Sequence, residues 1–108
     1  MQAIKRNLAE KLSYLIKPEG EVHAVMPDEE TFSLKALQQY VGGNIEVVCR
    51  TRDGYILLSN KEGKQKGLPV NEVATSLCSE ESGSGEIVAG KAMLAHPDHI
   101  DKLYLAKG

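Results

Sequence analysis

The chain has little aromatic content, with no Trp, one Phe and four Tyr among 108 residues. Bases of single-stranded nucleic acids stack on aromatic side chains, so few surfaces suit such a ligand. The formal net charge is -2, from 13 basic and 15 acidic residues. The chain as a whole therefore does not attract a polyanion, and nucleic acid is an unexpected partner.

Long apolar segments are also missing. No apolar run approaches the roughly 20 residues that span a bilayer, and the polar N-terminus lacks the apolar region of a signal peptide. The two cysteines, Cys49 and Cys78, lie in apolar surroundings without CxxC spacing. This favours reduced, buried thiols over a disulfide framework. We expect a cytoplasmic protein without membrane contact.

Catalytic and metal-binding motifs are absent from the sequence as well. It contains no nucleophile elbow, no HExxH and no paired-carboxylate spacing. His96, Asp98 and His99 are too few ligands for a closed zinc site, and we expect these histidines at the surface. The sequence predicts no enzyme, no catalytic residue, no metal and no cofactor.

The patterns that are present predict an α+β domain. We expect an antiparallel sheet of four to five strands packed on two short core helices, in the order helix, hairpin, helix, hairpin, helix, strand and tail. The central βαββαβ order permits a ferredoxin-like arrangement. The predicted organisation is an N-terminal amphipathic helix at residues 1–12, one core domain at 13–95, and a tail or short helix at 96–108.

The N-terminal region shows two overlapping patterns. Apolar residues at helical spacing predict an amphipathic helix, which is also a candidate for partner binding or self-association; they are Ile4, Leu8, Leu12 and Leu15. Residues 14–17 also fit a strand that turns at 18–20 into a second strand at 21–26. Both hold if the helix ends near Leu12.

Turn and capping residues divide the rest of the chain. Asp53-Gly54 predicts a hairpin between residues 44–52 and 55–60. Ser33 starts a helix that ends at Val41, after which Gly42 or Gly43 takes a left-handed conformation. A polar loop follows Gly63.

The last third of the chain contains one more helix and one more strand. Asn71 is expected to cap a helix of two turns, to about Leu77. The polar, glycine-rich residues 79–85 are predicted to form a mobile connection. Residues 86–95 read as the last core strand, with Gly90 as a bulge or close contact.

Four blocks of sequence resemble a family of small uncharacterised proteins from bacteriophages and conjugative elements. They are the run from Phe32 through Gly42-Gly43-Asn44 to Val48, Asn60 to Lys64 around Gly63, Gly67-Leu68-Pro69-Val70-Asn71 with Ala74-Thr75, and Ile87-Val88-Ala89-Gly90. That family is catalogued as a domain of unknown function. The resemblance implies a compact αβ domain on a mobile genetic element, hence in the cytoplasm of a bacterial host cell. Small accessory proteins of such elements often modify host machinery, and the resemblance implies no reaction.

The best candidate ligand site is basic. Arg50 and Arg52 share one face of the predicted hairpin, and Tyr55 across the turn can join them. Lys64 adds charge if its loop folds toward them, and Asn71 offers an amide, although a helix cap explains Asn71 better. Solvated strand residues that discourage edge pairing are the plainer interpretation of the two arginines.

Three hypotheses on function follow. The first is a non-enzymatic accessory protein of phage or mobile-element origin that binds a protein partner from the host or the element. The second is an oligomeric protein that binds or sequesters a nucleotide or similar anion, in a pocket shared between identical subunits. The third is a weak nucleic-acid-binding module.

Overall fold

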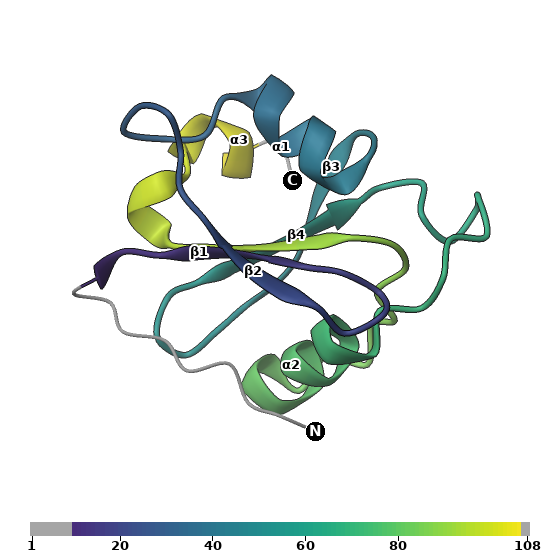
Figure 1. Cartoon of the computed structure of the whole chain (residues 1–108). Coiled ribbons are helices and arrows are strands. Elements are labelled where there is room, and N and C mark those ends of the chain that lie inside the picture. Colours follow the sequence, from purple (N-terminus) through teal and green to yellow (C-terminus); the bar gives the residue numbers. More distant parts are fainter. Residues whose placement is uncertain (1–9, 107–108) are drawn as a thin grey trace.

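Five antiparallel strands form the centre of the protein, with helices on both faces of the sheet (Figure 1). The computed structural model describes residues 10–106. The strands are β1 (Ser13–Ile16), β2 (Val22–Val25), β3 (Ile45–Arg50), β4 (Ile56–Asn60) and β5 (Ala92–Ala95). The helices are α1 (Leu34–Val41), α2 (Glu72–Ser82) and α3 (Lys102–Ala106), with a 3-10 turn at Pro97–His99. The predicted α+β class is confirmed.

The last strand lies in the middle of the sheet. The strand order is β2-β1-β5-β4-β3, and every neighbouring pair is antiparallel. Two hairpins, β1–β2 and β3–β4, are thus joined by β5. The ferredoxin-like arrangement is wrong. It would place β2 and β5, the first and last strands of the βαββαβ unit, side by side, whereas β1 lies between them and pairs with both.

Each face of the sheet carries its own apolar core. On the face covered by α2, which we call the α2 side, the core contains Ile16, Leu57, Leu77, Val88 and Leu94. On the opposite face, the α1 side, it contains Phe32, Leu37, Val41, Ile56, Leu58, Met93 and Ile100. Strands β4 and β5 contribute alternate residues to both cores and are buried throughout, as expected of central strands covered on both faces.

The helix ends follow local chemistry. The Ser33 hydroxyl accepts the Ala36 N–H at 3.0 Å, and Gly42 ends α1 with φ +82°, as predicted. Asn71 caps α2. The predicted length of two turns is wrong for this helix. The predicted mobile connection at 79–85 is also wrong for residues 79–82, which belong to α2. Helix α2 continues to Ser82 and ends at Gly83, which has φ +70°, because Gly83 is the first residue suited to the left-handed cap.

The remaining differences concern the two ends of the chain. Hairpin β1–β2 is confirmed, while residues 1–9 of the predicted N-terminal helix lie outside the described residues. The predicted strand at 86–95 forms a ladder from Ala92 onward, preceded by a bridge between Ala89 and Val70. Gly90 has φ +85°, and a Cβ there would lie 2.8 Å from Cδ1 of Leu68, so the predicted close contact is confirmed.

Candidate functional site

The predicted basic site is divided by the structure. A bulge between Val47 and Cys49 shifts the register of β3, so that Arg50 follows the buried, α2-facing Cys49 and faces the α1 side. Arg52 instead reaches α2, where its guanidinium donates to the Glu80 carbonyl at 3.0 Å. The two arginines therefore do not form one surface.

Tyr55, Lys64 and Asn71 do not join them. Tyr55 is fully buried, and its hydroxyl donates to the Leu12 carbonyl at 3.0 Å. Lys64 pairs with Glu86 at 3.0 Å, beyond the end of β4 that lies away from the Asp53-Gly54 turn. Asn71 is fully buried, caps α2 and donates to the carbonyls of Ile16 and Gly90, both at 2.9 Å. Its interpretation as a helix cap is confirmed.

Residues of the family-like sequence blocks form contacts between the loop after β4, the segment before α2 and the segment before β5. A Cβ at Gly63 would lie 2.7 Å from the Ala89 carbonyl, so the loop after β4 passes close to the segment before β5. The Pro69 carbonyl accepts the Gly90 N–H, and the Asn71 N–H donates to the Val88 carbonyl, both at 2.7 Å. The sequence blocks that are far apart in the chain therefore meet in space and have a structural role.

The two histidines near the C-terminus are buried, so their predicted surface position is wrong. His99 Nδ1 lies 2.8 Å from the Ser13 hydroxyl oxygen, which also accepts the His96 N–H at 2.9 Å. The His99 ring packs edge-on against Phe32. Burial, with a smaller contribution from His96, lowers the pKa of His99 below its usual value of 6.5. The cluster favours a neutral His99 and joins β1 to the C-terminal turn.

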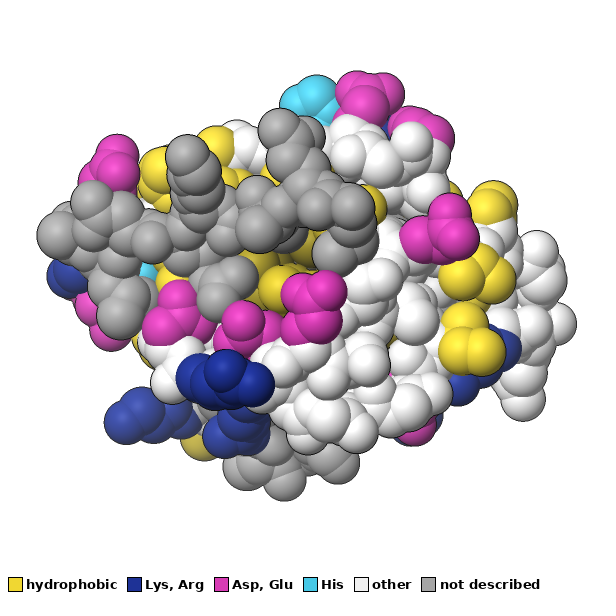
Figure 2. All heavy atoms as spheres, turned by 90° about the horizontal axis from the view of Figure 1, so that it is seen from below, with side chains coloured by type: hydrophobic (Ala, Val, Ile, Leu, Met, Phe, Trp, Pro, Cys, Tyr) yellow, Lys and Arg dark blue, Asp and Glu magenta, His cyan; other side chains and the backbone are white. Residues whose placement is uncertain are grey.

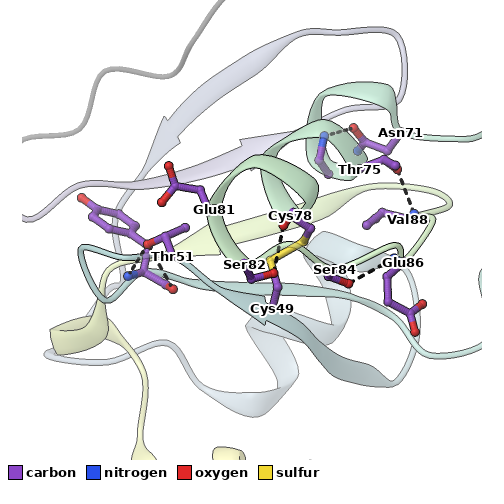
Figure 3. Close-up of a disulfide and its surroundings, with 12 residues drawn as sticks. Cys49, Thr51, Asn71, Thr75, Cys78, Glu81, Ser82, Ser84, Glu86 and Val88 are labelled. Atoms are coloured by element: carbon purple, nitrogen blue, oxygen red, sulfur yellow. Dashed lines mark hydrogen bonds between the residues drawn. A yellow bond between two sulfur atoms is a disulfide. The ribbon is translucent and has the colours of Figure 1, made fainter.

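Cys49 and Cys78 form a disulfide, so the prediction of reduced thiols is wrong. Figure 3 shows the two side chains meeting between β3 and α2. Their Cα atoms are 5.9 Å apart, a separation that suits the bond. Sequence spacing did not reveal the pair because 29 positions separate the two cysteines and the packing of α2 on β3 brings them together.

Strand β3 is an open edge of the sheet, and sequence analysis missed it as a site. Among the strands of residues 10–106, β3 has β4 as its single neighbour. The Lys61 N–H donates to the Asn44 carbonyl at 2.8 Å, which makes Asn44–Lys61 a hydrogen-bonded pair of this ladder. Hydrogen bonding alternates along an antiparallel ladder, so the N–H and C=O groups of Ile45 and Val47 point away from β4.

Two clefts flank this edge on opposite faces. The cleft on the α2 side has a volume of about 310 Å³, and its lining includes Glu46, Val48, Ser59 and Ile87. The cleft on the α1 side has a volume of about 240 Å³, and its lining includes Leu34, Ile45, Val47 and Tyr104. Residues 46–47 line both. An extended chain beside β3 would thus have a hollow next to it on each face.

The sequence does contain one signal for this edge. From the sequence, Arg50 is interpreted as a solvated strand residue that discourages edge pairing, and Glu46 is a second charged residue of the same β-rich run. The flanking clefts had no such signal, because Leu34, Ile87 and Tyr104 come from distant parts of the chain.

Other kinds of site find little support in the described residues. On the face seen in Figure 2, the Lys and Arg side chains that gather at the lower left lie directly beside a row of Asp and Glu side chains. Within residues 10–106, no cluster of three or more His, Cys, Asp or Glu is placed to hold a metal ion. No helix in the same range is long and apolar enough to cross a membrane.

Comparison with known proteins gives one match. A family model described as "Domain of unknown function (DUF3846)" matches residues 11–104. No curated protein matches the chain, and no solved structure does.

Proposed function

The chain belongs to the DUF3846 family, a domain of unknown function, and we propose that it is a non-enzymatic accessory protein that binds an extended segment of a protein partner along β3. The observation that carries this proposal is the open edge of β3 between two clefts on opposite faces. A phage or mobile-element origin is part of the proposal and rests on the sequence resemblance described above.

Strand addition matches the chemistry of this edge. A partner strand would exchange hydrogen bonds with the outward N–H and C=O groups of Ile45 and Val47, while its side chains alternate between the two clefts. The bulge after Val47 limits regular pairing to the first half of β3. The partner segment is therefore short, with about three residues in register.

The anion-binding alternative has less support. Arg52, Lys64 and Asn71 already have partners within the described structure, and Tyr55 is fully buried. A nucleic-acid-binding role is weakened by the mixed charges of Figure 2.

The bacterial cytoplasm remains our proposed location. The Cys49–Cys78 disulfide weighs against it, because cytosolic reductants keep most thiols reduced. Burial offsets this argument: Cys78 is fully buried and Cys49 is 7% exposed, so a reducing thiolate has little access to the sulfur atoms.

The decisive variant is Val47→Pro, which removes one outward N–H and leaves the β3–β4 ladder intact. Its matched control is Ala24→Pro on the other sheet edge. The Lys17 N–H donates to the Glu21 carbonyl, so Ala24 likewise points its N–H outward from hairpin β1–β2. Circular dichroism would establish that both variants fold.

Each chain would then be used to capture proteins from a lysate of bacteria that carry the gene. We expect a captured protein to be lost with Val47→Pro and retained with Ala24→Pro. Equal capture by all three chains would refute docking on β3.

A further inference from the structure

Glu46 lies between the two β3 residues whose backbone groups face outward, and it faces the opposite side from them. Ile45 and Val47 pack against the core of the α1 side. Side chains alternate along a strand, so Glu46 faces the α2 side, where it lies opposite Ser59 of β4. Among the described residues, Glu46 is exposed and has no ion-pair partner.

We infer that the partner segment reads apolar–basic–apolar, with Lys or Arg opposite Glu46 and apolar residues opposite Ile45 and Val47. This inference rests on the proposed function. Residues directly opposite each other on neighbouring strands have Cβ atoms about 4.5–5.5 Å apart, so each β3 side chain selects its own counterpart.

The apolar positions follow from the cleft on the α1 side. Ile45 and Val47 are half-buried, and Leu34 is 40% exposed at the rim. A partner side chain in this cleft would cover these apolar surfaces together with the Tyr104 ring. Burial of such surface favours a Val, Ile or Leu over a polar residue.

The basic position follows from the charges on the α2 side. Lys64 is already paired with Glu86 at 3.0 Å, so Glu86 is partly neutralised. Lys61 shares the cleft with Glu46 but belongs to the segment that continues β4, one strand further from a docked chain. Glu46 is therefore the charged residue that β3 itself presents on the α2 side, and a cation opposite it is favoured.

The test uses two synthetic peptides, acetyl-Ser-Thr-Val-Lys-Val-Thr-Ser-amide and the same peptide with Glu in place of Lys. Each reads the same in both directions, so parallel and antiparallel docking are tested together. Binding to the ¹⁵N-labelled full chain would be followed by NMR through the amide signals of β3, at peptide concentrations up to several millimolar. This range suits a single short strand with few contacts.

We expect the Lys peptide to bind about fivefold more tightly than the Glu peptide, as one cross-strand charge pair would give. Glu46→Lys should invert this preference, and Glu46→Gln should abolish it. Equal affinity of the two peptides for the unmodified chain, or a preference unchanged in Glu46→Lys, would overturn the inference.

Failure of the inference can be told apart from failure of the proposed function. If both peptides bind equally and both lose binding in Val47→Pro, docking on β3 stands and the sequence preference is wrong. If neither peptide shifts the amide signals of β3, the docking edge itself is refuted, and the inference with it.

Discussion

The two faces of the sheet are held by different kinds of chemistry. On the α2 side, a disulfide joins α2 to β3, and the fully buried Asn71 connects α2 to two other segments. On the α1 side, aromatic rings pack edge-on around Phe32, and His99 meets Ser13. The buried disulfide becomes accessible to a reductant once the chain unfolds, whereas a buried histidine responds to acid. The two faces should therefore fail under different conditions.

The largest expected effect is on the α2 side. Reduction of Cys49–Cys78 opens a loop whose ends are 29 positions apart, and should lower the free energy of unfolding by about 3.5 kcal/mol. Helix α2 has only Ala74, Leu77 and Cys78 as buried residues, so little apolar contact replaces the bond. Urea unfolding with and without dithiothreitol measures the loss. The Cys49→Ser/Cys78→Ser variant should not respond to the reductant; a midpoint unaffected by reduction in the unmodified chain would contradict the prediction.

Two helix caps, one on each face, give the next comparison. Asn71→Ala removes the cap of α2 and leaves the buried carbonyls of Ile16 and Gly90 without their side-chain donor, at a cost of about 3 kcal/mol. Ser33→Ala on the α1 side removes an exposed cap alone, at about 1 kcal/mol. Chemical denaturation of both variants measures the difference. Equal losses would show that the second role of Asn71 contributes nothing.

The smallest expected effect is the acid response of the α1 side. The pKa of His99 is lowered in the folded protein, so the unfolded chain binds more protons near and below pH 6.5. Stability is then complete above pH 6.5 and falls as the pH drops through the folded pKa. Lys11 and Asp98 are the charges near this cluster. Lys11 lowers the pKa of the Asp98 carboxyl below 3.8, so the protonation of Asp98 changes stability at a lower pH than the protonation of His99 does.

Urea midpoints between pH 5 and 8 test the acid response. The loss toward pH 5 should shrink in His99→Gln and persist in His23→Gln, which changes an exposed histidine on β2. An identical pH curve for the unmodified chain and His99→Gln would assign the acid response to other groups.

Local signals in the sequence predicted much of the fold. Ser33, Asn71 and the Asp53-Gly54 turn act within a few residues, and all three were predicted in their observed positions. The continuation of α2 to Ser82 was missed because Ser79 and Ser82 flank two glutamates next to a glycine-rich stretch, and serine side chains compete with the backbone for hydrogen bonds and so favour turns. Tertiary contact with β3 supports this helix, and composition alone does not report it.

Long-range features could not be predicted in the same way. The central position of β5, the Cys49–Cys78 bond and the burial of His96 and His99 depend on segments that are distant in sequence. The candidate site shares this dependence. β3 is an edge because β5 pairs with β4 on the other side, and its clefts are completed by residues from α1, α3 and the loop before β5.

The central position of β5 also has a consequence for protein synthesis. Hairpins β1–β2 and β3–β4 emerge first from the ribosome, but each lacks its neighbour until residues 92–95 have been made. Two of the strand edges exposed on the nascent chain are therefore edges that the finished protein hides. Closure of the sheet waits for the synthesis of β5, so a product truncated before Ala92 would expose these edges to aggregation.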